Sequence, residues 1–300
     1  MKRFRECRKI NKMKKKLKII LIVTICAAAV VLAVVAIALN YHNLYVFSET
    51  QGWFRREIAV RSAEDVKCSE YSIDSLLHDS RVSFEQSLML VNTENMLPSG
   101  FIADVIEYKD TDVYMNSCML DSYAKLSAAV KDRTRNKLYV SSDFRSAAEQ
   151  QALYMKDPLT ATLPGASEHQ TGLALDVYVA YYSGDGFIKS PSGRFVNSHA
   201  HEYGFIIRYP SYAEDITGIR YEPWHIRYVG HPHADVIYNN HTTLEEYIEG
   251  LDVGQWYEIE GYLVSRQRMA DEKLLLPERF TSCVVSPDNT GNYIVTVECE

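Results

Sequence analysis

A continuous apolar run near the N-terminus restricts the fold of this chain more than any other feature. Residues 19–39 carry no charged side chain, and Thr24 is the only polar residue among them. A helix satisfies its backbone hydrogen bonds internally, and ~21 residues rising ~1.5 Å each span about 30 Å, the thickness of a bilayer's hydrocarbon core. No face of such a helix has polar residues to meet solvent, which disfavours a soluble core helix. The run predicts a transmembrane anchor over residues 19–39.

An export signal that is later cleaved is the alternative, because Ala36-Ile37-Ala38 resembles a small-residue cleavage site. The run is longer than the ~7–15 apolar residues typical of such signals, which favours an uncleaved anchor. Residues 1–40 also hold ten Lys or Arg against Glu6 alone. Because basic flanks stay on the cytoplasmic side, we expect residues 1–18 in the cytoplasm and the chain from about residue 41 outside the cell membrane.

The rest of the chain is acidic. It holds 22 Lys or Arg against 38 Asp or Glu. A body of that charge is repelled by a phosphate backbone, so nucleic acid is not an expected partner.

The cysteines leave two interpretations open. Cys68, Cys118, Cys283 and Cys299 lie in the part expected to face an oxidising exterior. Four thiols allow three pairings, and the close pair Cys283 and Cys299 would clip a hairpin. Four buried free thiols are the alternative. No Cys-x-x-Cys occurs, so a thiolate zinc site is not expected.

The pattern of the body predicts three parts. Residues 40–85 combine amphipathic character with many charges and predict a helical stalk. Residues 86–252 interleave strands with helices and predict the functional domain. Residues 253–300 predict a small β appendage, with strands at 256–264 and 293–297 and a hairpin turn at 288–291.

Within residues 86–252 the two kinds of element are told apart by hydrophobic period and turn residues. The expected strands are 87–92, 137–142, 173–179, 205–209 and 226–229. The expected helices are 119–130, 146–154, 197–203 and 244–251. The second helix begins with Ser146 and Glu149, the spacing of a capping box. This order of elements predicts an α+β fold.

Two short stretches hold the side chains of a metal site. They are Ser167-Glu168-His169-Gln170-Thr171-Gly172-Leu173-Ala174-Leu175-Asp176 and Glu222-Pro223-Trp224-His225. Together they supply two imidazoles and a carboxylate as ligands, and Glu222 as a spare carboxylate. A catalytic zinc keeps three protein ligands and leaves one position for water, whose proton a nearby Glu can take. The set predicts metal-assisted hydrolysis.

Local geometry is compatible with such a site. Side chains alternate along the strand 173–179, so Asp176 faces away from the aliphatic residues and is placed to line a cleft. Glu222 and His225 are three residues apart and would face opposite ways on a regular strand. Pro223 favours a turn or irregular strand start there, which would bring both side chains to one cleft.

The other histidines have an ordinary interpretation. A lone His in a folded domain is more often a hydrogen-bonded structural residue than a ligand. His199 with His201, and His231 with His233, are spaced as ligand pairs, but neither pair has a carboxylate at ligand spacing. We therefore expect both pairs in loops or on the surface.

Four segments, in order, resemble the VanY-type D-alanyl-D-alanine carboxypeptidases, zinc peptidases that trim the peptide stems of bacterial cell-wall precursors. They are Leu90-Val91-Asn92 with Leu97-Pro98, Ser141 to Ser146 with Gln150, Ser167 to Asp176, and Tyr203-Gly204-Phe205 through Glu222 to Tyr228. The resemblance covers roughly residues 85–250, and its last two motifs are the most specific. It implies a mainly antiparallel central sheet with flanking helices, in agreement with the α+β order.

The resemblance implies a role for each matching residue. His169, Asp176 and His225 would bind Zn²⁺, and Glu222 would be the general base and acid. Arg145, Gln150 and Ser167 would lie where the family contacts substrate. A guanidinium suits a terminal carboxylate or an oxyanion. The alternative for Arg145 is a surface position, paired with a neighbouring acidic residue.

One departure from the family is visible before Arg145. The family often has Gly and Tyr there, where this chain has Asp143 and Phe144. Asp143 adds a negative charge near a site meant to receive an anionic C-terminus. The departure bears on substrate preference more than on catalysis.

By resemblance, the expected reaction is removal of the C-terminal D-Ala from peptidoglycan stem peptides ending in D-Ala-D-Ala, which would link the chain to glycopeptide (vancomycin) resistance. An L,D-carboxypeptidase acting on tetrapeptides, or a D-Ala-D-Ala dipeptidase, would use the same zinc core. A catalytically silent wall-binding ectodomain is an alternative of another class. The intact Glu222 argues against it, because a structural metal site needs no base.

Overall fold

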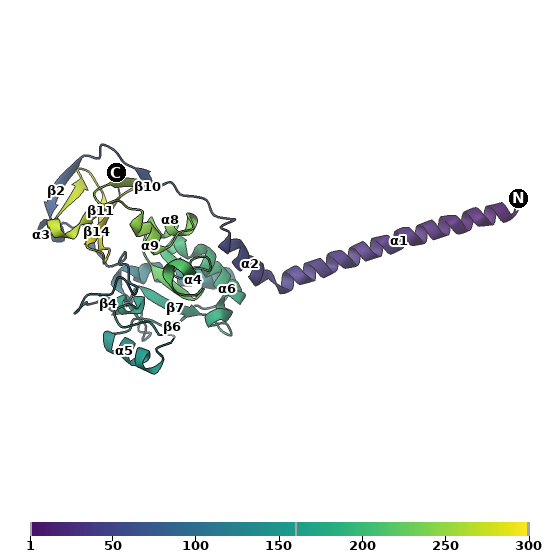
Figure 1. Ribbon diagram of the computed structural model, residues 1–300, viewed down its shortest axis with the longest axis horizontal. Helices are drawn as coiled ribbons and strands as arrows, with labels where there is room; N and C mark the ends of the chain where they lie inside the picture. The colour runs from purple at the N-terminus through teal and green to yellow at the C-terminus, as the bar shows by residue number, and fades with distance from the viewer. Residues whose placement is uncertain (1, 160, 299–300) are drawn as a thin grey trace. The chain divides into compact units, whose positions relative to one another are not determined.

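A computed structural model describes residues 2–159 and 161–298, with side chains from residue 12 onward (Figure 1). The chain divides into two compact units, residues 1–48 and 49–300. The first unit is helical, with α1 (Lys2–Leu39) followed by the start of α2 (Tyr41–Thr50).

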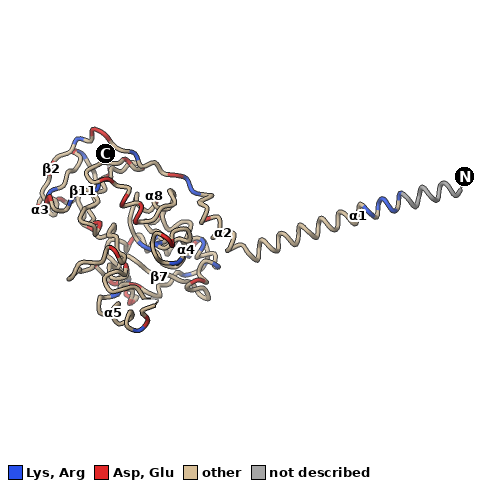
Figure 2. The backbone as a smooth tube through the Cα atoms, viewed as in Figure 1, with Lys and Arg blue, Asp and Glu red and all other residues tan. Residues whose placement is uncertain are grey.

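Helix α1 contains a segment, Lys12–Leu39, that is long and apolar enough to cross a membrane, and a signal sequence meets the same criteria. The Thr24 hydroxyl donates to the Ile20 carbonyl at 2.9 Å, so this polar side chain is satisfied within the helix. Figure 2 shows Lys and Arg at the start of the coloured part of α1 and none along the apolar stretch that follows.

The second unit contains a four-stranded sheet that carries the candidate site. Its order is β6 (Tyr139–Ser142), β7 (Ala174–Tyr178), β9 (His225–Tyr228) and β8 (Phe205–Ile207), and every ladder is antiparallel. Leu175 and Val177 of β7 are buried in one cluster with Leu126 of α4 (Leu120–Thr134) and Val196 of α6 (Pro191–His199). Helices thus cover one face of this sheet, and Asp176 faces the other.

A second sheet has six strands. Their order is β1 (Arg61–Ser62), β10 (Trp256–Ile259), β11 (Tyr262–Arg268), β14 (Asn292–Glu298), β13 (Ser282–Pro287) and β3 (Val82–Phe84). Only the β13–β3 ladder is parallel among these. Helices α8 (His233–Asn239) and α9 (Leu244–Glu249) share a buried cluster with Val264 and Ile294 of this sheet and Ile206 of β8.

The opposite face of the six-stranded sheet is covered by a smaller layer. Strands β2 (Cys68–Ser72) and β12 (Lys273–Pro277) pair antiparallel, and α3 (Ile73–Leu77) lies between β2 and β3 in the chain. Leu76, Leu274 and Leu276 share a buried cluster with Val285 and Val295. Two more short strands, β4 (Val105–Glu107) and β5 (Tyr114–Asn116), form a separate ladder.

Most elements predicted inside residues 86–252 are present. The expected helices at 119–130 and 244–251 are α4 and α9, and the one at 146–154 is α5 (Ala147–Lys156) with both hydrogen bonds of its capping box. The expected strands from 137 onward are β6 to β9. The run 197–203 is the end of α6 and a 3₁₀ turn at Ala200–Tyr203.

The strand expected at 87–92 is wrong. Leu88, Met89, Leu90 and Val91 are buried, but their segment has no ladder. Its backbone groups are satisfied elsewhere: the Leu88 N–H donates to the Ser286 hydroxyl at 2.9 Å, and the Met89 carbonyl accepts from Arg227 at 2.8 Å. Apolar residues alone do not distinguish a buried loop from a buried strand when side chains supply the hydrogen bonds.

The helical stalk expected over 40–85 is helical only in α2 and the short α3. Strands β1, β2 and β3 pair instead with strands from the last 45 residues of the chain. Val82 and Phe84 are partly buried while Ser83 is exposed, the alternation of a half-buried strand. A pairing across about 200 residues leaves no local helical or strand signal strong enough to predict it.

The C-terminal strands differ from the prediction in two respects. The run 256–264 forms two strands, β10 and β11, and the turn at 288–291 joins β13 to β14 as expected. Residues from before 86 complete their sheet, so 253–300 do not form it alone. Cys68, Cys118 and Cys283 are free thiols, while Cys299, and with it the pair Cys283–Cys299, lies outside the described residues.

Candidate metal centre

Two of the predicted ligands are neighbours across the sheet. Asp176 in β7 and His225 at the start of β9 are direct cross-strand partners. Their side chains meet on the face opposite the helices, where His225 Nδ1 lies 3.1 Å from Asp176 Oδ1. The alternation predicted for residues 173–179 is therefore present, with Asp176 on the cavity side.

The third predicted ligand, His169, lies in the 3₁₀ turn Glu168–Thr171 that precedes β7. The turn ends at Gly172, which has φ +70° and whose Cβ would lie 2.5 Å from Val105 Cγ1. Nδ1 of His169 donates to the Asp143 carbonyl at 2.8 Å, which leaves Nε2 facing Asp176 Oδ2 at 3.5 Å. The hydrogen bond to the Asp143 carbonyl thus fixes which ring nitrogen of His169 is available to a metal.

The three side chains converge on one point. A ligand atom from each lies within 4.8 Å of the others. The two imidazole rings stand nearly perpendicular, at 87°, with centroids 5.1 Å apart. No other group of three or more His, Cys, Asp or Glu side chains in the described chain has this spacing.

The chemistry of these donors fits a divalent metal. Two imidazoles and one carboxylate form a nitrogen and oxygen set that suits zinc. Asp176 Oδ1 is buried and has no hydrogen-bond partner among the residues described, an arrangement that is costly unless a cation completes it. Burial opposes ionisation of Asp176, but the contacts with His169 and His225 hold its pKa far below the usual range.

The two imidazoles have different electrostatic environments. Burial lowers the pKa of His169. Burial also opposes protonation of His225, yet its contacts with Asp176 and Glu168 raise its pKa to about 9. A metal binds the deprotonated ring, so metal binding at this centre would be coupled to proton release.

Glu222 reaches the same centre through a turn. The His225 N–H donates to the Glu222 carbonyl at 3.1 Å, which closes a turn over Pro223 and Trp224. Glu222 Oε2 consequently lies 3.8 Å from His225 Nδ1. Burial raises the pKa of the Glu222 carboxyl. The predicted turn at Pro223 is confirmed.

A cavity of about 550 Å³ opens over this centre. It is lined by all seven residues that the sequence singled out, namely Arg145, Gln150, Ser167, His169, Asp176, Glu222 and His225. Tyr209, Trp224 and the segment 217–219 complete part of its wall. The Glu222 carboxylate, the three predicted metal ligands and the Arg145 guanidinium thus surround one cavity.

Arg145 lies between β6 and α5, with its side chain toward the cavity. Nη2 donates to the Ser167 hydroxyl at 3.4 Å, and Nε is buried with no hydrogen-bond partner in the described chain. Burial lowers the pKa of its guanidinium. The alternative of a surface ion pair with Asp143 or Glu149 is not seen, because Arg145 forms no ion pair with any described residue. Glu149 instead accepts from the Ser146 N–H at 2.8 Å.

Gln150 and Asp143 have local partners. The Gln150 amide donates to the Thr162 carbonyl at 2.6 Å, and its Oε1 is buried without a partner in the part of the chain described. The Asp143 carboxylate accepts the Tyr114 N–H at 2.6 Å and does not line the cavity. The negative charge of Asp143 is therefore engaged by the backbone of β5.

The competing histidine pairs have structural partners. His199 pairs with Glu202, while His201 and His231 both contact the Asp235 carboxylate. His233 is 2% exposed, so the expected surface or loop position is wrong for it. It was misplaced because Pro232 and its neighbours resemble a loop, whereas the ring contacts Tyr247 and Thr296 inside the molecule.

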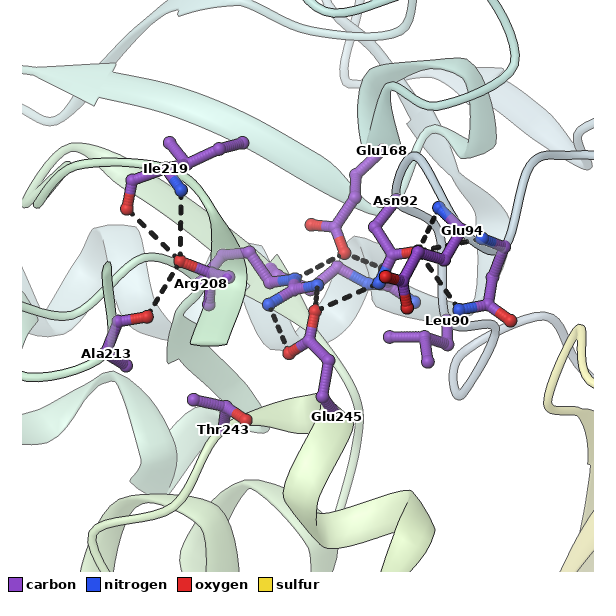
Figure 3. Close-up of polar contacts among 12 residues, drawn as sticks. Leu90, Asn92, Glu94, Glu168, Arg208, Ala213, Ile219, Thr243 and Glu245 are labelled. Carbon is purple, nitrogen blue, oxygen red and sulfur yellow. Dashed lines mark hydrogen bonds and ion pairs between the residues drawn. The ribbon is translucent and has the colours of Figure 1, made fainter. Parts of the chain in front are cut away.

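A group of buried charged residues lies beside the centre and was not predicted from the sequence. Glu168, Arg208 and Arg227 are each at most 1% exposed, and Glu245 pairs with Arg208 (Figure 3). Charged side chains are normally assigned to solvent. The available signal was proximity: Glu168 precedes His169, and Arg227 follows His225 by two residues.

Comparison with known proteins identifies relatives of this chain. The profile of the VanY family, D-alanyl-D-alanine carboxypeptidase, matches residues 112–231. A D-alanyl-D-alanine carboxypeptidase of Enterococcus faecium is 30% identical over 252 residues, which span 76% of this chain and 82% of that protein.

Solved structures share the fold. The vancomycin resistance D,D-dipeptidase VanXYg, in complex with a D-Ala-D-Ala phosphinate analogue, is 26% identical with a TM-score of 0.58, over 77% of this chain and 98% of that one. The LD-carboxypeptidase LdcB is 30% identical with a TM-score of 0.51, over 66% and 99%. With the motifs and the centre in place, the chain belongs to the VanY family of D-alanyl-D-alanine carboxypeptidases.

Proposed function

We propose that this chain is a membrane-anchored zinc carboxypeptidase that removes the C-terminal D-Ala from peptidoglycan stem peptides ending in D-Ala-D-Ala. The observation that carries the proposal is the convergence of His169, Asp176 and His225 in one cavity with Glu222. Membership of the VanY family supports the reaction class. The intact Glu222 supports an enzyme over a silent wall-binding domain.

His169, Asp176 and His225 would hold the zinc. When bound, zinc supplies a Lewis acid and lowers the pKa of a bound water toward ~7. Glu222 takes the proton of the attacking water as general base and returns it to the leaving amine of D-Ala as general acid. Burial raises the Glu222 pKa, which brings the carboxyl closer to the pH at which it must exchange that proton.

Arg145 is proposed to bind the anionic end of the substrate. Its Nε is buried without a partner among the described residues, and it lines the cavity with Ser167 and Gln150. A guanidinium fork matches a carboxylate in two parallel hydrogen bonds and also stabilises an oxyanion. Ser167 and Gln150 would contact the peptide beside it.

The division of the chain suits an enzyme of the cell wall. We propose that residues 1–18 are cytoplasmic, that 19–39 anchor the protein, and that the peptidase (86–252) faces the outside. The basic start and apolar run of α1 support this orientation. Residues 40–85 and 253–300 lie outside the proposed peptidase domain.

Turnover by the full-length protein tests the proposal. The protein in detergent, supplied with zinc, should release D-Ala from a synthetic pentapeptide ending in D-Ala-D-Ala. Glu222→Gln should abolish that release. The proposal fails if no D-Ala appears, or if the variant and the wild type release it equally.

Two related structures favour testing further substrates of the same proposed centre. The fold is shared with the LD-carboxypeptidase LdcB and with the D,D-dipeptidase VanXYg. The same centre would serve a tetrapeptide or a free D-Ala-D-Ala dipeptide. Parallel assays on pentapeptide, tetrapeptide and dipeptide discriminate the three, and the substrate with the highest kcat/KM identifies the class.

The proposed activity has a consequence for glycopeptide antibiotics. Removal of terminal D-Ala from wall precursors destroys the dipeptide to which vancomycin binds. Expression in a susceptible strain should therefore lower vancomycin susceptibility. Unchanged susceptibility, with D-Ala release confirmed in the same cells, would assign the enzyme to routine wall maturation.

A further inference from the structure

The two nitrogens of His225 face two different carboxylates. Nδ1 faces Asp176 at 3.1 Å, and Nε2 faces Glu168 Oε2 at 3.5 Å. Both atoms are buried, and within the described chain neither has a hydrogen-bond partner. The two atoms face each other at the edge of the ring away from Asp176.

The Glu168 carboxylate is held firmly from its other side. Its Oε1 accepts from Arg208 Nε at 2.7 Å and from Arg227 Nη1 at 2.7 Å. Figure 3 shows Glu168 and Glu245 on either side of the Arg208 guanidinium. The side chain of Glu168 is fully buried and those of the two arginines are at most 1% exposed.

The two arginines are themselves fixed. Arg208 binds Glu245 through both terminal nitrogens, at 2.9 and 2.5 Å. Arg227 donates to the backbone carbonyls of Ser87 and Met89 at 3.0 and 2.8 Å. Glu168 therefore cannot turn without breaking its ion pairs with both anchored arginines, and its Oε2 stays directed at His225.

Such a cluster is costly to build. Two carboxylates and two guanidinium groups leave water, and well-packed apolar residues often replace buried ion pairs with no loss of stability. Charge balance explains why the group is tolerated. It does not explain why one oxygen, Oε2, is left without an arginine and directed at an imidazole.

We infer that Glu168 is a positioning residue for His225: its Oε2 accepts the Nε2–H and thereby holds the ring in the tautomer whose Nδ1 lone pair faces the metal. A neutral imidazole has one N–H, so the partner of one nitrogen decides which nitrogen can bind a cation. The same contact fixes the ring's orientation. The inference rests on the proposed zinc centre.

Zinc affinity of the full-length protein in detergent tests the inference without reference to turnover. Glu168→Gln keeps the shape of the side chain and removes the charge that Nε2–H contacts. Partners of this kind are worth ~10–100-fold in metal affinity, so chelator competition should show zinc binding weakened by about that factor. Glu245→Gln is the matched control, because it removes a carboxylate from the same cluster without touching His225. Its zinc affinity should equal that of the wild type.

The outcomes separate the inference from the proposed function. Equal zinc affinity of Glu168→Gln and wild type overturns the inference, and so does equal weakening in both variants, which would mark the cluster as purely structural. A wild-type protein that binds no zinc refutes the zinc centre itself. If Glu168→Gln does not fold, the imidazole ¹⁵N shifts of the zinc-loaded wild type decide: a proton on His225 Nε2 supports the inference, and one on Nδ1 overturns it.

Discussion

At the scale of single residues, substitution of Glu222 distinguishes catalysis from metal binding. Glu222 is 3.8 Å from the nearest ligand nitrogen and lies outside the three-ligand group. Glu222→Gln should therefore retain zinc at wild-type stoichiometry and lose D-Ala release by about 10²–10⁴-fold, the usual contribution of a general base. Glu214→Gln, a change at an exposed residue of α7 (Glu214–Thr217), should leave both unchanged. Loss of zinc from Glu222→Gln would instead identify Glu222 as a ligand.

The residues of the site were largely accessible from the sequence, and their supports were not. The seven predicted side chains line one cavity. They could be found because they sit in short motifs whose residue types and spacing are typical of a metal site. Their individual roles stay predictions. Glu168, Arg208 and Arg227 were missed because burial of a charge depends on a partner elsewhere in the chain. Arg208 lies 40 residues from Glu168 and Arg227 lies 59 from it.

At the scale of elements, Gly172 allows the 3₁₀ turn Glu168–Thr171 to pack closely against β5. Gly172 and Gly218 both end a short helical turn with φ near +70°, but a Cβ meets Val105 and Asn116 only at Gly172. Gly172→Ala should lower the free energy of unfolding by roughly 3 kcal/mol, from left-handed strain plus overpacking. Gly218→Ala should cost about 1–2 kcal/mol, from left-handed strain alone. If chemical denaturation shows the same loss of unfolding free energy for both variants, the close packing against Val105 and Asn116 is not what makes Gly172 necessary.

His233 links three elements and predicts a pH dependence of stability. The ring lies in α8 and contacts Tyr247 of α9 and Thr296 of β14, and burial lowers its pKa to about 3. Below pH ~6.5 the unfolded chain binds a proton there that the folded chain does not. The His233 contribution to stability is thus complete above pH ~6.5 and falls as the pH drops toward 3.

The free energy of unfolding measures this effect. Between pH 7 and 5.5 the wild type should lose about 1 kcal/mol more than His233→Gln, which has no such proton to bind. Urea unfolding of both proteins at the two pH values makes the comparison. Identical pH dependence of the two would contradict the assignment to His233.

Elements were predictable where the signal was local. The helix α5 carries its capping box within four residues, and β7 alternates within seven, so both are found from the sequence. The buried segment 87–91 and the strands β1, β2 and β3 were not, because their partners lie about 140–200 residues away. Their hydrogen bonds are decided by the tertiary fold, which a local pattern does not contain.

At the scale of the whole molecule, the apolar segment of α1 predicts how the chain is attached. Ten basic residues before an apolar run should keep the N-terminus inside and place the acidic body outside. In intact cells without a wall, added protease should digest the body, and alkaline carbonate should leave the undigested full-length chain in the membrane fraction. A shorter, soluble chain that begins near residue 39 would show instead that the segment is a cleaved signal.

The proposed activity of the whole molecule depends on a metal held by His169, Asp176 and His225. Crystals of the zinc-loaded protein, with data collected on both sides of the zinc absorption edge, locate the ion directly. We predict one anomalous peak at about 2.0–2.2 Å from His169 Nε2, His225 Nδ1 and an Asp176 oxygen, the usual range for zinc ligands. An anomalous map with no peak between these three side chains, from protein that releases D-Ala in the same zinc buffer, would contradict the account.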